Sequence, residues 1–215
     1  EGVEKGGGAY REMMNMAFGS AAKFNKNVCS FVLTDSTTDI SDVPLAQKVV
    51  AFEIPDNARE LAMNPPFRDI PGGINRQLGL ALVCATPLKL EAQLKFIEDH
   101  PEFQGRTNIM FIDSDILIGK AVGPMFKKPF SVGVTPQDRD SDNHAINAGM
   151  VAVHKDGLDG AKAFFRLTIE SWKEISVEHQ GKPFYFGDQL ALKRAVDKLT
   201  CNKLKWIGAA PSTAT

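Results

Sequence analysis

A short apolar run that ends in two acidic residues places the tightest constraint on how this chain folds. The run "NIMFID" covers residues 108–113, and Ser114 alone separates Asp113 from Asp115. Such a run is typical of a strand buried on both faces, which other layers of the fold must cover. Two carboxylates this close repel, and burying them is costly unless a cation compensates. The segment therefore predicts a buried strand that ends at a bound cation.

Strand and helix patterns alternate along the rest of the chain. Strand-like runs lie at 28–34, 48–54, 108–113, 130–135 and 148–154. Helical patterns lie at 9–26, 74–100, 157–175 and 188–199, and residues 55–73 are expected to be irregular. Pro87 is expected to break the second helix, with Thr86 capping its second piece. The alternation predicts an α/β fold, in which ligands bind beyond the carboxyl ends of the strands.

Composition narrows the kind of protein. The 215 residues suit a single domain, and a net charge of −1 offers no basic surplus for nucleic acid or an anionic membrane. No apolar run reaches the ~20 residues of a membrane span. The cysteines, Cys29, Cys84 and Cys201, are too far apart for a clustered zinc site or a disulfide framework.

Two features of the sequence bear on its location. The absence of Asn-x-Ser/Thr sequons and the few cysteines favour the cytoplasm. The chain begins at Glu1 rather than Met, which is compatible with the removal of an anchor or a first strand. The alternative is therefore a Golgi-lumen domain separated from its anchor.

The pair Asp113 and Asp115 has three explanations. Aspartate favours turns and helix caps, so a strand that ends in a turn often carries it. A divalent cation such as Mg²⁺ or Mn²⁺ takes oxygen ligands, usually one or two carboxylates and the phosphates of a substrate. The third is a phosphatase of the haloacid-dehalogenase type, whose nucleophilic aspartate lies in a similar motif. That motif usually lies near the N-terminus, and "GDQLALK" (187–193) lacks the later acidic residue of that class.

Segments in a fixed order resemble the glycosyltransferases of the GT-A fold. "FIDSDILIG" (111–119) resembles their metal-binding DxD segment, "NAGMVAVHK" (147–155) the strand that follows it, and "FGDQLAL" (186–192) the Asp-Gln of a later helix. The start, "GGGAYREMMNMAFGSAAKF" and then "VCSFVLTD", resembles a nucleotide-contacting loop, a helix and the second strand. The resemblance is closest to glycosyltransferase family eight and its blood-group-enzyme relatives.

The resemblance implies a single GT-A domain over residues 1–215, with a central, mostly parallel mixed sheet flanked by helices. It implies an enzyme that moves a sugar from a UDP-sugar to a hydroxyl of a carbohydrate or glycan acceptor, with retention of the anomeric configuration. Mn²⁺ or Mg²⁺ would bridge the aspartates and the diphosphate. Asp115 would bind the metal directly, and Asp113 the metal or the donor's hydroxyls, with Ser114 in the same donor-binding segment.

The resemblance also implies a set of sugar contacts. Asn147 would contact sugar hydroxyls or the acceptor, and Ala148 and Gly149 would allow close approach of backbone and sugar. Asp188 and Gln189 would lie near the anomeric carbon. The alternative role for Asp188 is the N-cap of its helix.

The resemblance implies two further donor contacts, one near the start of the chain and one in the second helix. Tyr10, next to a glycine loop that includes Gly8, would stack on uracil; alternatively it packs on the core. Arg76 would reach the donor sugar or phosphate; alternatively it is a solvated helix arginine.

The chain departs from family eight in two places. The similar-looking "HQGKPF" (179–184) precedes Asp188, whereas the family's third metal ligand is a histidine near the C-terminus. Almost no room remains before Tyr10 for the family's first strand. Two alternatives stay open: a sugar-nucleotide pyrophosphorylase, whose expected proline "GGGAYREMM" (6–14) lacks, and a non-catalytic nucleotide-sugar-binding domain.

Overall fold

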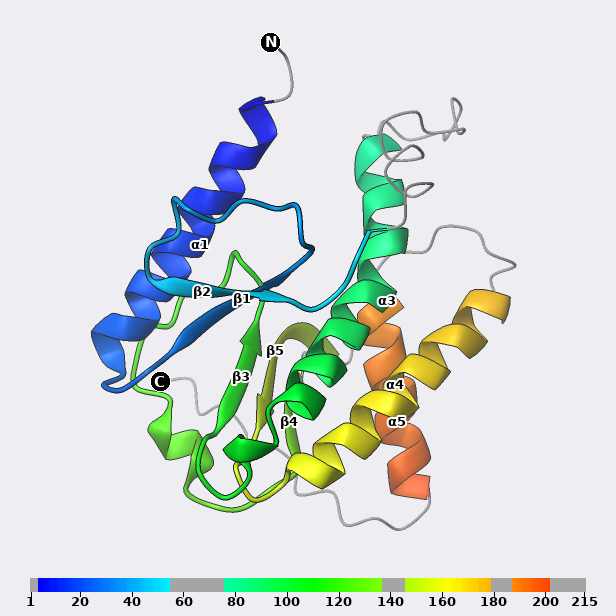
Figure 1. Ribbon diagram of the computed structural model, residues 1–215. Helices are drawn as coiled ribbons and strands as arrows, with labels where there is room; N and C mark the ends of the chain where they lie inside the picture. Colours follow the sequence, from blue (N-terminus) through cyan, green and yellow to red (C-terminus); the bar gives the residue numbers. More distant parts are fainter. Residues whose placement is uncertain (1–3, 55–75, 137–145, 179–186, 202–215) are drawn as a thin grey trace.

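The computed structural model describes residues 4–54, 76–136, 146–178 and 187–201 of the chain (Figure 1). Each strand and helix expected within these ranges is present, so the α/β class is confirmed. In order, the elements are α1 (Glu4–Phe24), β1 (Ser30–Thr34), β2 (Ala46–Val50), α3 (Arg76–Asp99), β3 (Ile109–Ile112), β4 (Val132–Pro136), β5 (Ile146–Val153), α4 (Leu158–Glu178) and α5 (Gly187–Cys201), with 3-10 turns at Pro101–Phe103 and Gly123–Phe126. The segment 55–73, expected to be irregular, lies outside the described residues.

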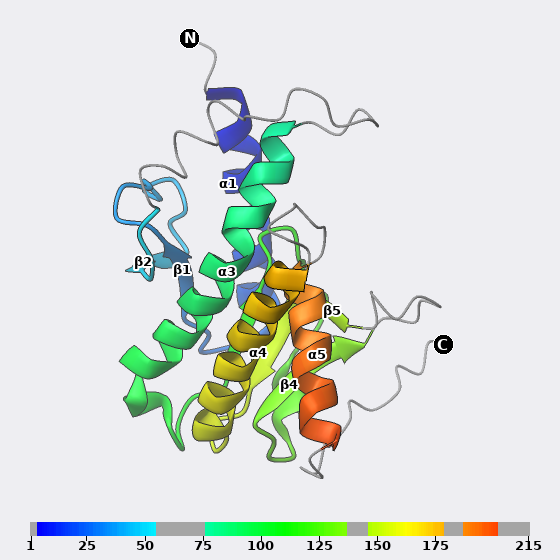
Figure 2. The same cartoon turned by 90° about the vertical axis from the view of Figure 1, so that its right-hand side faces the viewer.

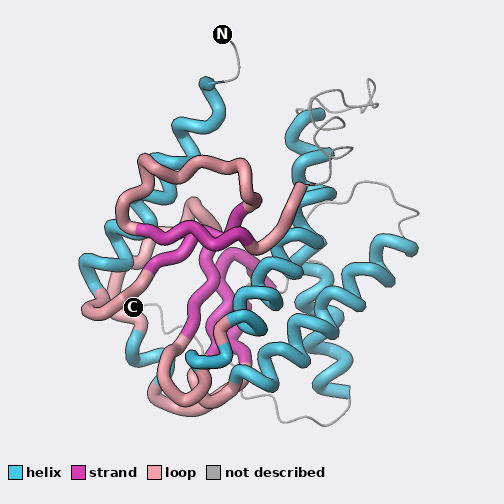
Figure 3. The backbone as a smooth tube through the Cα atoms, in the orientation of Figure 1, coloured by secondary structure: helices cyan, strands magenta, loops and turns pink. Residues whose placement is uncertain are grey.

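The described strands form two small sheets (Figure 3). β1 and β2 pair in parallel, whereas β5 lies between β3 and β4 and pairs antiparallel with both. They therefore differ from the expected central, mostly parallel sheet. A parallel crossover needs about a dozen residues or more, and the connection 137–145 is too short to return β5 parallel to β4.

Three helices lie side by side against the three-stranded sheet, with α4 between α3 and α5 (Figures 1 and 2). The main core is shared by these helices and the strands, and its members include Phe96, Ile97, Phe111, Val151, Phe165 and Leu192. A second, smaller cluster joins the helices to one another through Leu90, Ile169, Ile175 and Ala191. Fully burying one such side chain contributes roughly 1.5–3 kcal/mol. Phe111 of β3 packs edge-on against Phe165 of α4, with ring centroids 5.7 Å apart. The strand that ends at the acidic pair is thus held firmly by the helical layer.

α1 holds the segment that follows the acidic pair. Ser20 Oγ accepts a hydrogen bond from the backbone N–H of Ile118 at 2.8 Å, and Asn25 Oδ1 accepts one from Val122 N–H at 2.8 Å. Both bonds join residues far apart in the sequence. They fix the course of the chain beyond β3 by satisfying backbone groups that no strand pairs.

α3 continues through Pro87, so the expected break is wrong. A proline inside a helix removes one hydrogen bond and costs about 3 kcal/mol or more. The residues that follow it bury Leu90, Gln93 and Ile97 against the rest of the molecule. Helices in proteins draw most of their stability from such packing, which sustains α3 across the proline. Thr86 therefore lies within the helix and not at a cap.

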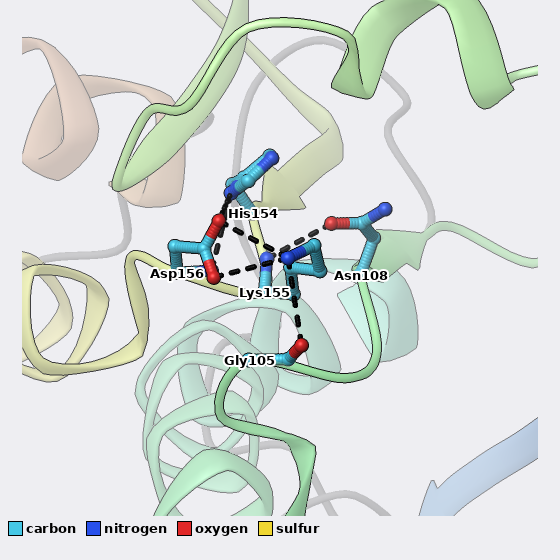
Figure 4. A network of polar contacts seen from close by, with 5 residues as sticks. All are labelled: Gly105, Asn108, His154, Lys155 and Asp156. Carbon is cyan, nitrogen blue, oxygen red and sulfur yellow. Dashed lines mark hydrogen bonds and ion pairs between the residues drawn. The ribbon is translucent and has the colours of Figure 1, made fainter.

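A polar network closes the other end of the β3–β5 pair, where β5 ends and β3 begins (Figure 4). The backbone N–H of Lys155 donates to Asn108 Oδ1 at 2.9 Å, and Lys155 Nζ lies 3.1 Å from Asp156 Oδ1 and 3.4 Å from Gly105 O. The backbone N–H of Asp156 donates to Nδ1 of the buried His154 at 3.1 Å. The turn after β5 is thereby fastened to the turn before β3, which holds the register of the pair.

A buried carboxylate organises the loop at the carboxyl end of β1. Asp35 is 3% exposed, and its carboxylate accepts hydrogen bonds from the backbone N–H groups and the hydroxyls of Thr37 and Thr38. Burial alone would raise the pKa of Asp35, but these hydrogen bonds favour the ionised form and hold the pKa well below its ordinary value.

We expect Asp35→Asn to destabilise the protein at neutral pH by about 1–3 kcal/mol. The asparagine NH₂ group would face the N–H and O–H donors of Thr37 and Thr38, and those donors would lose an acceptor. The pKa of Asp35 is lower in the folded than in the unfolded state. Its contribution is therefore complete above the unfolded-state pKa and is lost as the pH falls through and below it. Urea unfolding between about pH 7 and pH 3 measures this, and the gap between wild type and variant should shrink towards the acid end.

The matched control is Asp39→Asn, because Asp39 accepts a similar local hydrogen bond from Ser41 but is exposed. It should lose less stability than Asp35→Asn. Equal losses in the two variants, or a gap that does not change with pH, would contradict the role given to Asp35.

Candidate functional site

The antiparallel register brings the acidic pair and the Asn-Ala-Gly segment together. Ile112, the last residue of β3, lies opposite Met150 of β5, and the backbone N–H of Asp113 donates to Gly149 O at 2.8 Å. Because β5 runs against β3, the first residues of β5 lie at the carboxyl end of β3. Two segments that are separate in the sequence therefore share one edge of the sheet.

Lys89 of α3 lies at the centre of this edge. Its Nζ is 2.7 Å from Asp113 Oδ1, 3.1 Å from Asp188 Oδ2 and 3.2 Å from the carbonyl oxygen of Ala148. The side chains of Lys89 and Asp188 are 27% and 19% exposed, and that of Asp113 is 41% exposed. A single ammonium group thus joins α3, the end of β3, the start of β5 and the first turn of α5.

The charge of Lys89 is set by its neighbours. Burial would lower its pKa, but the facing carboxylates of Asp188 and Asp113 raise the pKa above its ordinary value. Lys89 therefore stays protonated throughout the neutral range. The sequence predicted a cation next to the acidic pair, and Lys89 is the cation that Asp113 contacts.

Gly149 leaves space where a side chain would collide with the site. A Cβ at this position would lie 2.8 Å from Asn147 Oδ1 and 3.3 Å from Asp113 Oδ2. Asn147 Oδ1 in turn accepts a hydrogen bond from the backbone N–H of Gly149 at 2.6 Å. Gly149 therefore presents bare backbone to one oxygen of Asp113, and the side chain of Asn147 folds back onto Gly149.

α5 begins at Gly187, so Asp188 lies in its first turn and not at the N-cap position that was the alternative role. Asp188 Oδ1 accepts a hydrogen bond from the backbone N–H of Gln189 at 2.9 Å, which leaves Oδ2 for Lys89. Gln189 Oε1 is buried and has no hydrogen-bond donor among the described residues. A group that donates a hydrogen bond to this oxygen would remove its desolvation cost.

The second acid of the pair is directed to solvent. A turn in which Ile116 N–H donates to Asp113 O at 3.1 Å places Ser114 half-buried and Asp115 exposed. Asp115 forms no hydrogen bond or ion pair with the part of the chain that the structure describes. Its carboxylate is therefore open to a ligand from outside.

The donor set suits a hard cation only if a ligand completes it. Within the described ranges, no group of three or more His, Cys, Asp or Glu side chains is placed to hold a metal ion. Mg²⁺ and similar ions often bind through one or two carboxylates plus substrate phosphates. Asp113 and Asp115 fit that pattern, and the segment 179–184 with His179 lies outside the described residues.

The other predicted donor contacts do not join the cluster. α1 begins at Glu4, so Gly8 is helical and the expected glycine loop is wrong; glycine costs about 1 kcal/mol in a helix but does not forbid it. Tyr10 is 55% exposed, which also argues against packing in the core. At about 1.5 Å per residue, Tyr10 lies about 15 Å along α1 from Ser20, the residue through which α1 contacts the segment after β3. Arg76 is the first residue of α3 and lies about 20 Å along that helix from Lys89.

A pocket adjoins the cluster through Asn147. It has a volume of about 650 Å³ and is lined mainly by apolar residues of the segment 116–125, together with Thr135, Asn147 and Met150. Its size is in the usual range of small-ligand sites. Neither this pocket nor Lys89 was expected from the sequence.

One signal could have pointed to Lys89. It falls four residues before Gln93 and seven before Phe96, both of which are buried on α3. A lysine on the buried stripe of a helix needs a carboxylate partner, because an unpaired ammonium is costly to bury.

No protein-family model, curated protein or solved structure matches this chain. None of the helices in the described ranges is both long and apolar enough to cross a membrane.

Proposed function

We propose that this chain is a metal-dependent glycosyltransferase of the GT-A type, which moves a sugar from a UDP-sugar to a hydroxyl of a carbohydrate or glycan acceptor. One observation carries the proposal: Lys89 joins Asp113 to Asp188, and the Asn147–Gly149 segment lies against the same Asp113 carboxylate. The resemblance assigns these three separate segments to one site. Unrelated turns and helix caps have no reason to meet at one place.

Each part of the cluster has a role in such a transfer. Asp113 and Asp115 would hold Mn²⁺ or Mg²⁺, which when bound supplies Lewis-acid stabilisation and a template for the leaving diphosphate. Asn147 and the bare backbone at Gly149 would position the donor sugar. Asp188, paired with Lys89, would stabilise positive charge that develops at the anomeric carbon, as expected for a retaining enzyme. An acceptor would enter from the adjoining pocket.

A simple assay separates this function from its alternatives. Metal-dependent release of UDP from a panel of UDP-sugars is expected of the transferase. Without an acceptor, a water molecule can take the place of the acceptor hydroxyl, and the donor is then slowly hydrolysed. A nucleotide-sugar-binding domain would bind the same compounds without turnover. Hydrolysis of p-nitrophenyl phosphate without release of UDP would instead indicate a phosphatase with Asp113 as nucleophile.

We expect UDP to bind at least about tenfold more weakly in EDTA than in Mn²⁺, because a diphosphate alone is repelled by the carboxylates of Asp113 and Asp115. Calorimetric titration with UDP, GDP and CMP, each with and without Mn²⁺, measures this and also tests the choice of base. Asp115→Asn should remove the Mn²⁺ dependence and leave the melting temperature unchanged, because this carboxylate is exposed.

The control for Asp115→Asn is Asp159→Asn, whose side chain is 92% exposed on α4. It should bind UDP as the wild type does. Equal UDP affinity in EDTA and in Mn²⁺ would refute the role given to the acidic pair.

We expect Asp188→Asn to lower kcat by more than about tenfold with little change in the affinity for UDP, because it removes a charge that acts on the transition state. Some loss of melting temperature should accompany it, since Lys89 loses one carboxylate partner. Turnover must therefore be expressed per folded molecule. Asp197→Asn, which breaks only an exposed pair with Lys193 on the same helix, is the control.

Normal turnover in Asp188→Asn would mean that Asp188 has a structural role only and takes no part in the transfer. Analysis of the product anomer by NMR tests retention separately. An inverted product would refute retention and leave the transferase proposal standing.

A further inference from the structure

We propose that Lys89 is a tethered counter-ion at the point between Asp113 and Asp188 where a divalent cation could bind in its absence, as distinct from the Asp113 and Asp115 pair proposed to hold the metal of the donor complex. In this role it keeps the two carboxylates together when no metal is bound, and it prevents them from forming a metal site without a nucleotide. The inference deepens the proposed function and depends on it only for the identity of the incoming cation. Its test needs no transfer activity.

The surroundings of the ammonium group carry the proposal. Three oxygens, from Asp113, Asp188 and the Ala148 carbonyl, lie 2.7–3.2 Å from Lys89 Nζ. Carboxylate and carbonyl oxygens are the ligands that Mg²⁺ and Mn²⁺ prefer. They belong to the residue after β3, to β5 and to α5, so the fold itself makes them converge on one point.

Electrostatics gives the lysine its function. Without a cation, the facing carboxylates of Asp113 and Asp188 would repel one another at a half-buried position. Because Lys89 is part of α3, its ammonium group compensates the two carboxylates at any concentration of free metal ion. A free cation must compete with it for Asp113 and is left with Asp115 and whatever oxygens a ligand brings.

This arrangement explains why metal and nucleotide should bind together. While Lys89 engages Asp113 Oδ1, the protein alone offers a cation Asp113 Oδ2 and the exposed Asp115. Such a site is incomplete until diphosphate oxygens are added. Lys89 thereby makes tight metal binding conditional on the donor and positions Asp188 at the same time.

The experiment is a titration with Mn²⁺ in the absence of nucleotide, followed by the electron paramagnetic resonance signal of free Mn²⁺. Lys89→Met keeps the side-chain length and removes the charge, so it should bind Mn²⁺ at least about tenfold more tightly than the wild type. Lys89→Arg keeps the charge and should retain the weak binding of the wild type. Adding Asp188→Asn to Lys89→Met should return the affinity to the wild-type level.

Thermal unfolding supplies a second readout. Lys89→Met should melt below the wild type, since two carboxylates lose their shared partner, and Mn²⁺ should raise its melting temperature by mass action. Mn²⁺ alone should change the wild-type melting temperature less. Lys89→Gln serves the same purpose if Lys89→Met does not fold.

Lys95→Met is the matched control, because Lys95 is also on α3 but pairs with Asp99 at the surface. It should leave Mn²⁺ binding unchanged. The proposal is overturned if folded Lys89→Met binds Mn²⁺ no more tightly than the wild type, or if Lys95→Met tightens binding equally. Neither outcome depends on whether the protein transfers a sugar.

Discussion

The ammonium group of Lys89 is the interaction on which the site depends. It contacts Asp113 after β3, the Ala148 carbonyl in β5 and Asp188 in α5, while its own backbone belongs to α3. Two carboxylates and one lysine leave a net charge of −1 at an edge of the sheet. If one partner is removed, a partly buried charge remains uncompensated, which costs more than the intact arrangement contributes.

The rest of the fold serves to bring these groups to one edge. The antiparallel pairing of β3 and β5 puts Asn147–Gly149 beside Asp113, and the polar network around Lys155 secures the opposite end of the same pair. The core between the sheet and α3, α4 and α5 sets the distance between Lys89 and Asp188. α1 holds the chain beyond β3, where the pocket lies next to Asn147.

Local patterns in the sequence predicted the elements well but their arrangement less well. Apolar runs and helical periodicity mark the described strands and helices because burial demands them. Sheet direction depends on connection length, and the short connection 137–145 could have indicated an antiparallel β4–β5 pair. Pro87 and Gly8 were misjudged because tertiary packing overrides local preference in α3, and glycine in α1 weakens a helix without ending it.

The same contrast between local pattern and arrangement in space holds for the site. Asp113, Asn147, Gly149 and Asp188 were recognised from motifs, and the structure places them together. Lys89 belongs to no motif, and only the packing of α3 against the sheet shows that it faces two carboxylates. Tyr10 and Arg76 were assigned from the resemblance, through an expected glycine loop and a helical arginine. Such a resemblance does not report distance, and Arg76 opens α3 about 20 Å along the helix from Lys89.

The central claim, that Lys89 couples α3 to α5 through Asp188, is tested most directly by a double-mutant cycle. The free energy of unfolding in urea is measured for the wild type, Lys89→Met, Asp188→Asn and the double variant. Direct contact predicts a coupling free energy of about 1–3 kcal/mol between the two residues. Losses that add to within about 0.5 kcal/mol would show that the two side chains do not interact and would contradict the account.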